Sequence, residues 1–182
     1  MTDQTLRPLK ERRALYIFGG LPGTGKSTLS LTIARELRAV HLRIDTIEGA
    51  LRAAGVWADG PAGYVVGHRL ATDNLRLGLP VVADSVNPLP ITRSAWRKAA
   101  QDVGVPFVEI EVICSDKGEH RRRIEARLRD NPMTTGPTWD DVMNREYQPW
   151  PEEHIVIDTA GQTPSQSVAA LCQLLGLLDE EK

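Results

Sequence analysis

One short segment constrains the fold of this chain more than any other feature of its sequence. It spans residues 20–28, where glycines lead into Lys26 and Ser27 in the pattern G-x-x-x-x-G-K-[S/T]. An apolar run precedes this segment and a stretch with helical periodicity follows it. Glycines let the backbone turn successive N–H groups inward, and the start of a helix adds unpaired donors and a positive dipole end. The segment therefore predicts a phosphate-binding loop between a strand and a helix.

The residue types in this loop suggest which groups contact a nucleotide. Lys26 is expected to reach the β- and γ-phosphates, and the hydroxyl of Ser27 is expected to bind Mg²⁺. The predicted nucleotide contacts from this segment are Gly20, Leu21, Pro22, Gly23, Thr24, Gly25, Lys26, Ser27 and Thr28.

Short apolar runs alternate with longer helical patterns along the chain. Strands are predicted at about 14–18, 41–44, 79–83, 106–113 and 154–157. Helices are predicted at about 26–38, 46–54, 64–77, 91–103, 116–129 and 165–177, and Thr138 to Asp141 resembles a capping box that restarts a helix. The alternation predicts an α/β fold with a parallel sheet covered by helices on both faces. A length of 182 residues suits a single domain, 1–182.

Two acids directly follow predicted strands, at the sheet edge where open parallel sheets bind ligands. Asp84 ends the apolar run 79–83, a pattern typical of a carboxylate that holds Mg²⁺. Asp45 ends the second strand, where a carboxylate opposite the loop can orient an acceptor hydroxyl and take its proton. Helix capping is the alternative role for each acid. Arg43 is a candidate for binding an anionic acceptor.

The helix predicted at 116–129 is rich in arginine. Ile124 and Leu128 define its buried stripe, and Arg123 and Arg127 lie together on the flank of that stripe. Arginines placed in this way before a Pro/Gly-rich loop are typical of a lid that closes on phosphates. We therefore expect a lid at about 117–150, with a solvated helix face as the alternative.

Other candidates carry weaker signals. The helical segment at about 46–77 is expected to bind the acceptor, with Tyr64 as a contact. Thr159 and Ala160 follow the fifth strand, where a loop can reach the base of the nucleotide. The four histidines lack the spacing of metal ligands, so core or surface roles are expected for them.

The composition excludes several classes of protein. A net charge of −2 gives no basic field for nucleic acid or an anionic membrane. No apolar run approaches the ~20 residues of a membrane span, and the polar N-terminus Met1–Arg13 shows no secretory signal. Cys114 and Cys172 are predicted to be buried free thiols in a reducing compartment, so the expected location is the cytoplasm.

Taken in order, these residues resemble the P-loop kinases of small hydroxyl-bearing acceptors. That group includes gluconate kinase, adenylylsulfate kinase, zeta toxin and the kinase domain of polynucleotide kinase, and its sequences are often labelled AAA-family ATPases. The likeness covers most of the chain. It lies in residues 20–28, 43–45 and 82–85, in Asn87-Pro88 with Arg93 and Trp96, and in Arg123 with Arg127.

The resemblance implies a five-stranded sheet in the order 2-3-1-4-5 with a lid. It also implies Asp45 as the base, Asp84 near Mg²⁺, a lid arginine at 123 or 127, and acceptor contacts from Asn87 and Arg93. The landmarks of a ring-forming AAA motor are missing from the sequence. We therefore expect an ATP- and Mg²⁺-dependent phosphotransferase acting on a hydroxyl of a small molecule. A polynucleotide or nucleoside 5′-kinase, and a nucleotide-gated binding module or slow ATPase, are the alternatives.

Overall fold

A five-stranded parallel sheet forms the centre of the protein. The computed structural model describes residues 13–56, 60–130 and 136–177. The polar N-terminus 1–12, residues 57–59 of the predicted acceptor segment, residues 131–135 of the predicted lid, and 178–182 lie outside the described residues. The strands lie in the order β2-β3-β1-β4-β5, which confirms the order that the resemblance implies. They are β1 (Leu15–Gly19), β2 (Val40–Arg43), β3 (Val81–Asp84), β4 (Phe107–Ile113) and β5 (Ile155–Asp158).

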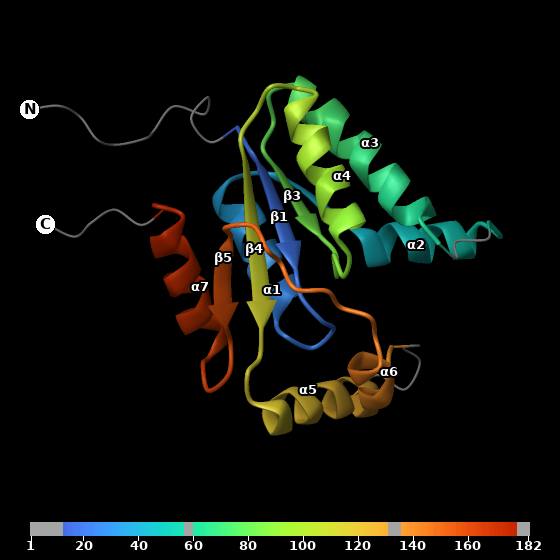
Figure 1. Ribbon diagram of the computed structural model, residues 1–182, viewed down its shortest axis with the longest axis vertical. Helices are drawn as coiled ribbons and strands as arrows, with labels where there is room; N and C mark the ends of the chain where they lie inside the picture. Colours follow the sequence, from blue (N-terminus) through green and yellow to red (C-terminus); the bar gives the residue numbers. More distant parts are fainter. Residues whose placement is uncertain (1–12, 57–59, 131–135, 178–182) are drawn as a thin grey trace, which may run out of the picture.

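Helices cover both faces of the sheet, as predicted (Figure 1). The helices α5 and α6 lie beyond the carboxyl edge of the sheet. The helices are α1 (Lys26–Glu36), α2 (Ile44–Ala53), α3 (Ala62–Arg76), α4 (Pro90–Gln101), α5 (Lys117–Asp130), α6 (Trp139–Met143) and α7 (Pro164–Leu174). Strand β1 shows why the core has two halves, because its side chains alternate between the faces. Tyr16 and Phe18 pack with α1 and α7, whereas Leu15 and Ile17 pack with α3 and α4.

The register of the strands brings the predicted site residues to one edge. Asp84 at the end of β3 pairs with Phe18 in β1 and with Arg43 in β2. The chain leaves β1 one residue later, at Gly19, and enters the glycine-rich loop. In a parallel sheet all carboxyl ends share one edge, so the loop, Asp84 and Arg43 lie side by side.

The predicted boundary between the second strand and the following helix is wrong. Ile44 was expected to end the second strand, but it begins α2, where its buried side chain packs against the same core. A short apolar run fits the end of a strand and the start of a helix equally well. Arg43 is therefore the N-cap residue, and Asp45 lies inside the first turn of α2. Asp84 caps no helix either, since α4 begins at Pro90 after Leu89.

Two other expectations are confirmed. Thr138 forms the predicted capping box with Asp141 and starts α6. Cys114 and Cys172 are buried free thiols, and burial raises the pKa of each. In the part of the chain that the structure describes, no helix combines the length and apolar character needed to cross a membrane.

Candidate active site

The glycine-rich loop has the backbone that its sequence predicts. Gly23 and Gly25 have φ values of 86° and 92°, in the left-handed region that favours glycine. Gly25 is also the N-cap residue of α1, and no side chain caps this helix. The first turn of α1 therefore keeps N–H groups and a positive dipole end for an anion.

Lys26 and Asp84 form a buried ion pair between this loop and the end of β3. The Nζ of Lys26 donates to Oδ1 of Asp84 over 2.6 Å, and both side chains are less than a tenth exposed. Burial by itself would raise the pKa of Asp84. The ammonium group of Lys26 and hydrogen bonds from Lys26, Ser27 and Ser30 outweigh this effect and hold the pKa below its usual value. The structure thus joins two residues 58 positions apart that the sequence assigned to one site.

The oxygen donors around Asp84 fit a magnesium ion. The Ser27 hydroxyl lies within hydrogen-bonding reach of the carboxylate. A hydroxyl and a carboxylate are hard ligands, and Mg²⁺ at nucleotide sites commonly takes only one or two protein groups and completes its shell with phosphates and water. Among the described residues there is no cluster of three or more His, Cys, Asp or Glu that could form a full protein cage. Ser27 and Asp84 are therefore the groups that would hold it.

The predicted acceptor residues surround the same edge of the sheet. The carboxylate of Asp45 is exposed in the first turn of α2. The Nε of Arg43 lies 3.5 Å from Oδ2 of Asp84. The hydroxyl of Tyr64 accepts a hydrogen bond of 3.2 Å from the backbone N–H of Asn87. Burial raises the pKa of Tyr64, with further contributions from the carboxylates of Glu48 and Asp45, so Tyr64 remains a neutral phenol.

Asn87 and Arg93 are fully buried and hold the backbone around the site. The side-chain amide of Asn87 donates to the carbonyl of Phe18 over 2.8 Å. The guanidinium group of Arg93 donates to the carbonyls of Gln148 and Pro149, each over 3.0 Å, and to that of Asn87 over 3.3 Å. It also stacks 4.8 Å from the ring centre of Trp150. Among the described residues, these backbone carbonyls are the groups to which both side chains donate, and the acceptor contacts implied by the resemblance stay predictions.

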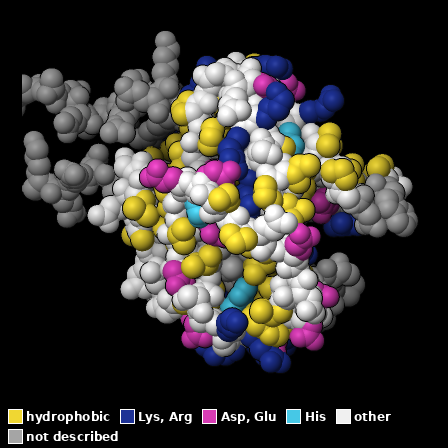
Figure 2. Space-filling model, viewed as in Figure 1, with side chains coloured by type: hydrophobic (Ala, Val, Ile, Leu, Met, Phe, Trp, Pro, Cys, Tyr) yellow, Lys and Arg dark blue, Asp and Glu magenta, His cyan; other side chains and the backbone are white. Residues whose placement is uncertain are grey.

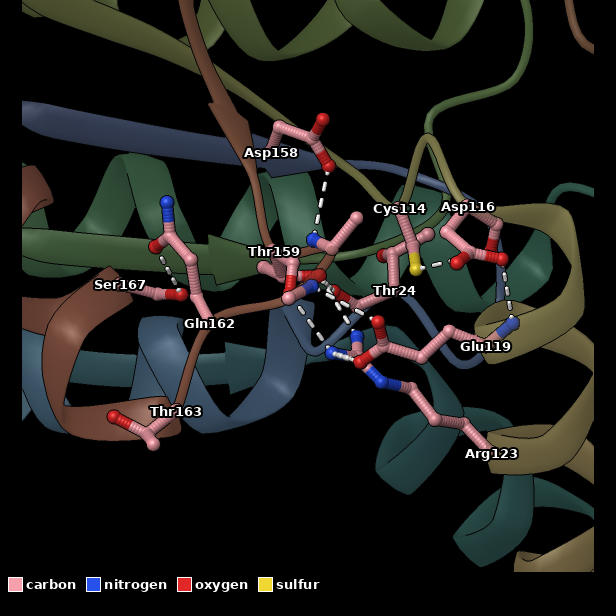
Figure 3. Close-up of polar contacts among 12 residues, drawn as sticks. Thr24, Cys114, Asp116, Glu119, Arg123, Asp158, Thr159, Gln162, Thr163 and Ser167 are labelled. Carbon is pink, nitrogen blue, oxygen red and sulfur yellow. Dashed lines mark hydrogen bonds and ion pairs between the residues drawn. The ribbon is translucent and has the colours of Figure 1, made fainter.

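Thr159 and Glu119 engage the guanidinium group of Arg123, so Arg123 is not a free lid arginine (Figure 3). Its guanidinium group donates to the hydroxyl of Thr159 over 2.8 Å, to the carbonyl of Thr159 over 2.9 Å and to Glu119 over 2.6 Å. Glu119 in turn accepts from the backbone N–H of Gly161. The hydroxyl of Thr159 lies 2.8 Å from the carbonyl of Thr24 in the phosphate loop. Arg123 therefore ties α5 to the loop that carries Thr159 and Ala160.

Arg127, by contrast, is exposed one turn further along α5. On the face seen in Figure 2, Lys and Arg side chains gather at the lower end, over α5, with acidic side chains among them. One such pair joins Arg121 to Glu125. Of the two predicted lid arginines, only Arg127 is exposed at its present position.

The contact between α5 and the phosphate loop could not be predicted from the sequence. The Nε2 of His120 lies 2.7 Å from the carbonyl oxygen of Pro22, and its ring packs edge-on against Trp139. Ile124 packs on Gly23. Ser30 and His41 were missed as well, although both contact the site. Their spacing carried a signal, since Ser30 lies four residues after Lys26 on α1 and His41 lies two before Arg43 on β2.

The fold and the site together define the class of protein to which this chain belongs. A parallel sheet in this order, a glycine-rich loop that leads into α1, and a loop lysine facing an acid on the neighbouring strand are the features of a P-loop kinase fold. The chain belongs to the family described as AAA domain, which matches residues 15–148.

Comparison with known proteins agrees with this class. The chain is 28% identical over 173 residues to a protein named probable adenylyl-sulfate kinase from Aeropyrum pernix, covering 86% of this chain and 88% of that protein. It is 30% identical over 103 residues to adenylyl-sulfate kinase from Myxococcus xanthus, covering 51% and 54% of the two chains.

Solved structures share the fold at low sequence identity. A putative kinase from Chloroflexus aurantiacus has a TM-score of 0.72 at 21% identity, covering 91% of this chain and 98% of its own. The APS kinase of Mycobacterium tuberculosis in complex with AMPPNP and APS has a TM-score of 0.69 at 22% identity, with the same coverage. A gluconokinase from Sinorhizobium meliloti has a TM-score of 0.61 at 14% identity, covering 93% and 99%.

Proposed function

We propose that the protein is an ATP- and Mg²⁺-dependent phosphotransferase that moves the γ-phosphate to a hydroxyl group of a small molecule. The observation that carries this proposal is the buried pair of Lys26 and Asp84, with Asp45 exposed in the first turn of α2, directly after the neighbouring strand β2. A phosphate-binding cation, a metal-binding acid and a free acid thus share the carboxyl edge of one sheet. These are the groups that phosphoryl transfer to an alcohol requires.

Each of these groups has a distinct role in the proposed reaction. Lys26 exchanges the carboxylate of Asp84 for phosphate oxygens when the nucleotide binds. Ser27 and Asp84 would hold Mg²⁺, which would supply neutralisation of the charge on the phosphates. The acceptor oxygen bonds to the γ-phosphorus while the bond to the bridging oxygen of ADP breaks, and the hydroxyl proton passes to Asp45. Asp45 is suited to this role because its side chain is exposed and caps no helix.

The surrounding residues divide between the two substrates. We assign Tyr64 and Arg43 to the acceptor side and the loop of Thr159 and Ala160 to the base of the nucleotide. Arg127 is the lid arginine free to reach the transferring phosphate, because Arg123 is engaged by Thr159 and Glu119. Arg123 contributes to transfer by holding the lid helix to Thr159, whose hydroxyl contacts the phosphate loop at the carbonyl of Thr24.

A direct test is to incubate the purified protein with ATP, Mg²⁺ and a panel of hydroxyl compounds, and to measure ADP and phosphorylated product. Adenylyl sulfate and gluconate belong at the head of the panel, because similar proteins are named for kinases of these compounds. The expected result is ADP release that depends on one acceptor. Hydrolysis at the same rate without any acceptor would favour a slow ATPase, and transfer only to oligonucleotide ends would favour a polynucleotide kinase.

Asp45→Asn tests the assignment of the base. Loss of general-base assistance typically costs about 10²–10⁴-fold in rate, so kcat is expected to fall by at least about a hundredfold while ATP binding is retained. Asp73→Asn is the matched control, because Asp73 is 70% exposed on α3 and pairs with Arg76. Full transfer by Asp45→Asn would show that the base is another group.

A further inference from the structure

A chain of hydrogen bonds leads from Asp84 away from the phosphate loop. The hydroxyl of Ser30 lies 3.1 Å from Oδ2 of Asp84, and Nε2 of His41 lies 3.1 Å from the same hydroxyl. The three residues come from α1, β3 and β2. Ser30 is fully buried, and the side chain of His41 is only 15% exposed. None of the roles proposed above uses Ser30 or His41.

The position of the hydrogens follows from the chemistry of the acceptors. Ser30 has a single hydroxyl hydrogen and three candidate acceptors: Oδ2 of Asp84 at 3.1 Å, the carbonyl of Ser27 at 3.2 Å, and Nε2 of His41 at 3.1 Å when that nitrogen carries no hydrogen. A carboxylate is the strongest acceptor of the three, so Ser30 donates to Asp84. The Ser30 oxygen then accepts from His41, which requires the hydrogen of the neutral imidazole to be on Nε2.

Burial of the ring lowers the pKa of His41, and the cations Arg43 and Lys26 lower it further, against the opposing effect of Asp84. In the arrangement inferred from the geometry, the Nε2–H of His41 points along the chain to the hydroxyl of Ser30.

The two oxygens of Asp84 consequently have different surroundings. Oδ1 faces Lys26, which would leave it for a nucleotide phosphate. Oδ2 faces Ser30, with Arg43 at 3.5 Å and His41 at 3.8 Å. We propose that Ser30 and His41 are positioning residues that hold Oδ2 of Asp84, so that Oδ1 is presented to the magnesium nucleotide. This proposal rests on the proposed function, since it concerns the same metal-binding carboxylate.

Calorimetry of ATP binding at a series of Mg²⁺ concentrations measures this effect without catalysis. Loss of a residue that orients a metal ligand typically weakens metal affinity about 10–100-fold. Ser30→Ala is expected to raise the Mg²⁺ concentration needed for half-maximal ATP binding at least about tenfold. ATP affinity in the presence of EDTA should remain close to that of the wild type, because the Ser30 hydroxyl contacts Asp84, His41 and the carbonyl of Ser27 rather than an N–H group of the phosphate loop.

Matched variants separate positioning from general damage to the fold. His41→Gln keeps an N–H donor near the position of Nε2 and should retain the wild-type Mg²⁺ dependence, whereas His41→Leu should weaken it as Ser30→Ala does. Thr32→Ala is the control for loss of a hydroxyl from α1, because the Thr32 hydroxyl bonds only to the carbonyl of Thr28 in its own helix. Wild-type Mg²⁺ dependence in Ser30→Ala, or equal weakening in His41→Gln and His41→Leu, would overturn the proposal.

A measurement on the ligand-free protein distinguishes this proposal from the proposed function. Nitrogen NMR at pH 8 should find the ring hydrogen of His41 on Nε2, and a hydrogen on Nδ1 would contradict the proposed chain whatever the nucleotide does. Failure of the wild-type protein to bind magnesium ATP at all would instead contradict the proposed function, and this inference with it.

Discussion

Replacing Gly23 with alanine tests how closely α5 packs on the phosphate loop. A Cβ atom at Gly23 would lie 2.6 Å from Cδ1 and 3.0 Å from Cγ1 of Ile124, and 3.3 Å from Cδ2 of His120. Carbon atoms pack best about 3.5–4.0 Å apart, so the new methyl group would overlap Ile124 by roughly 1 Å. Gly25 is the matched position, because its φ is similar but its Cβ would meet only Thr159, at 3.6 Å.

The expected loss of stability has two parts, the left-handed backbone and the overlap with Ile124. A left-handed conformation costs alanine about 1–2 kcal/mol. Alanine also makes the unfolded chain less flexible than glycine does, which stabilises the folded protein by about 0.4–1 kcal/mol. Gly25→Ala should therefore lower the free energy of unfolding by roughly 1 kcal/mol. Gly23→Ala adds the overlap with Ile124, and overpacking costs about 1–3 kcal/mol, so a total of roughly 2–4 kcal/mol is expected.

Urea unfolding of the ligand-free variants measures both values. The double variant Gly23→Ala/Ile124→Val removes Cδ1, the atom in closest contact, and should be more stable than the sum of its single changes predicts. If Gly23→Ala costs no more than Gly25→Ala, or if the two changes at 23 and 124 are additive, α5 does not pack on the loop as described.

Three further changes have defined outcomes. The depressed pKa of Asp84 contributes stability that is present above the unfolded value near 3.8 and is lost as pH falls through the folded pKa. Wild-type stability should therefore fall more steeply below about pH 4 than that of Asp84→Asn, and parallel acid-unfolding curves would contradict this. Arg93→Met leaves three carbonyls without their charged donor and should lower the free energy of unfolding by about 3 kcal/mol or more in urea; a loss below about 1 kcal/mol would refute the role of Arg93. Arg123→Met should speed amide hydrogen exchange at residues Thr159 to Gly161, while the free energy of unfolding changes by less than about 1 kcal/mol. Unchanged exchange rates would show that Arg123 is not needed to hold that loop.

The sequence predicts features whose cause is local. The apolar runs, the glycine pattern and the acids after strands specify the sheet, the loop and the residues at its carboxyl edge. The sequence alone could place Lys26 and Asp84 at one site, because a parallel sheet aligns the carboxyl ends of all its strands. The strand order came from the resemblance, since periodicity alone does not order strands.

Contacts that depend on tertiary packing could not be predicted in the same way. An arginine in a polar helix pattern gives no sign that Arg93 is fully buried under residues 148–150. Helical periodicity placed Arg123 and Arg127 on one flank, but it could not show that Thr159 and Glu119 engage only the first of them. The packing of Trp150 against Gly19 joins residues far apart in sequence and has no local signature.

The proposed reaction requires the loop at 20–28 to bind a magnesium nucleotide through Lys26. Isothermal calorimetry with ATP and Mg²⁺, on the wild-type protein and on Lys26→Met, measures this binding without catalysis. We predict saturable uptake by the wild-type protein and at least about tenfold weaker binding by the variant, because one charge-assisted contact to phosphate is worth about 1.5–3 kcal/mol. Absence of uptake by the wild-type protein would show that the loop does not bind a nucleotide, and equal affinity in Lys26→Met would show that Lys26 does not hold its phosphates.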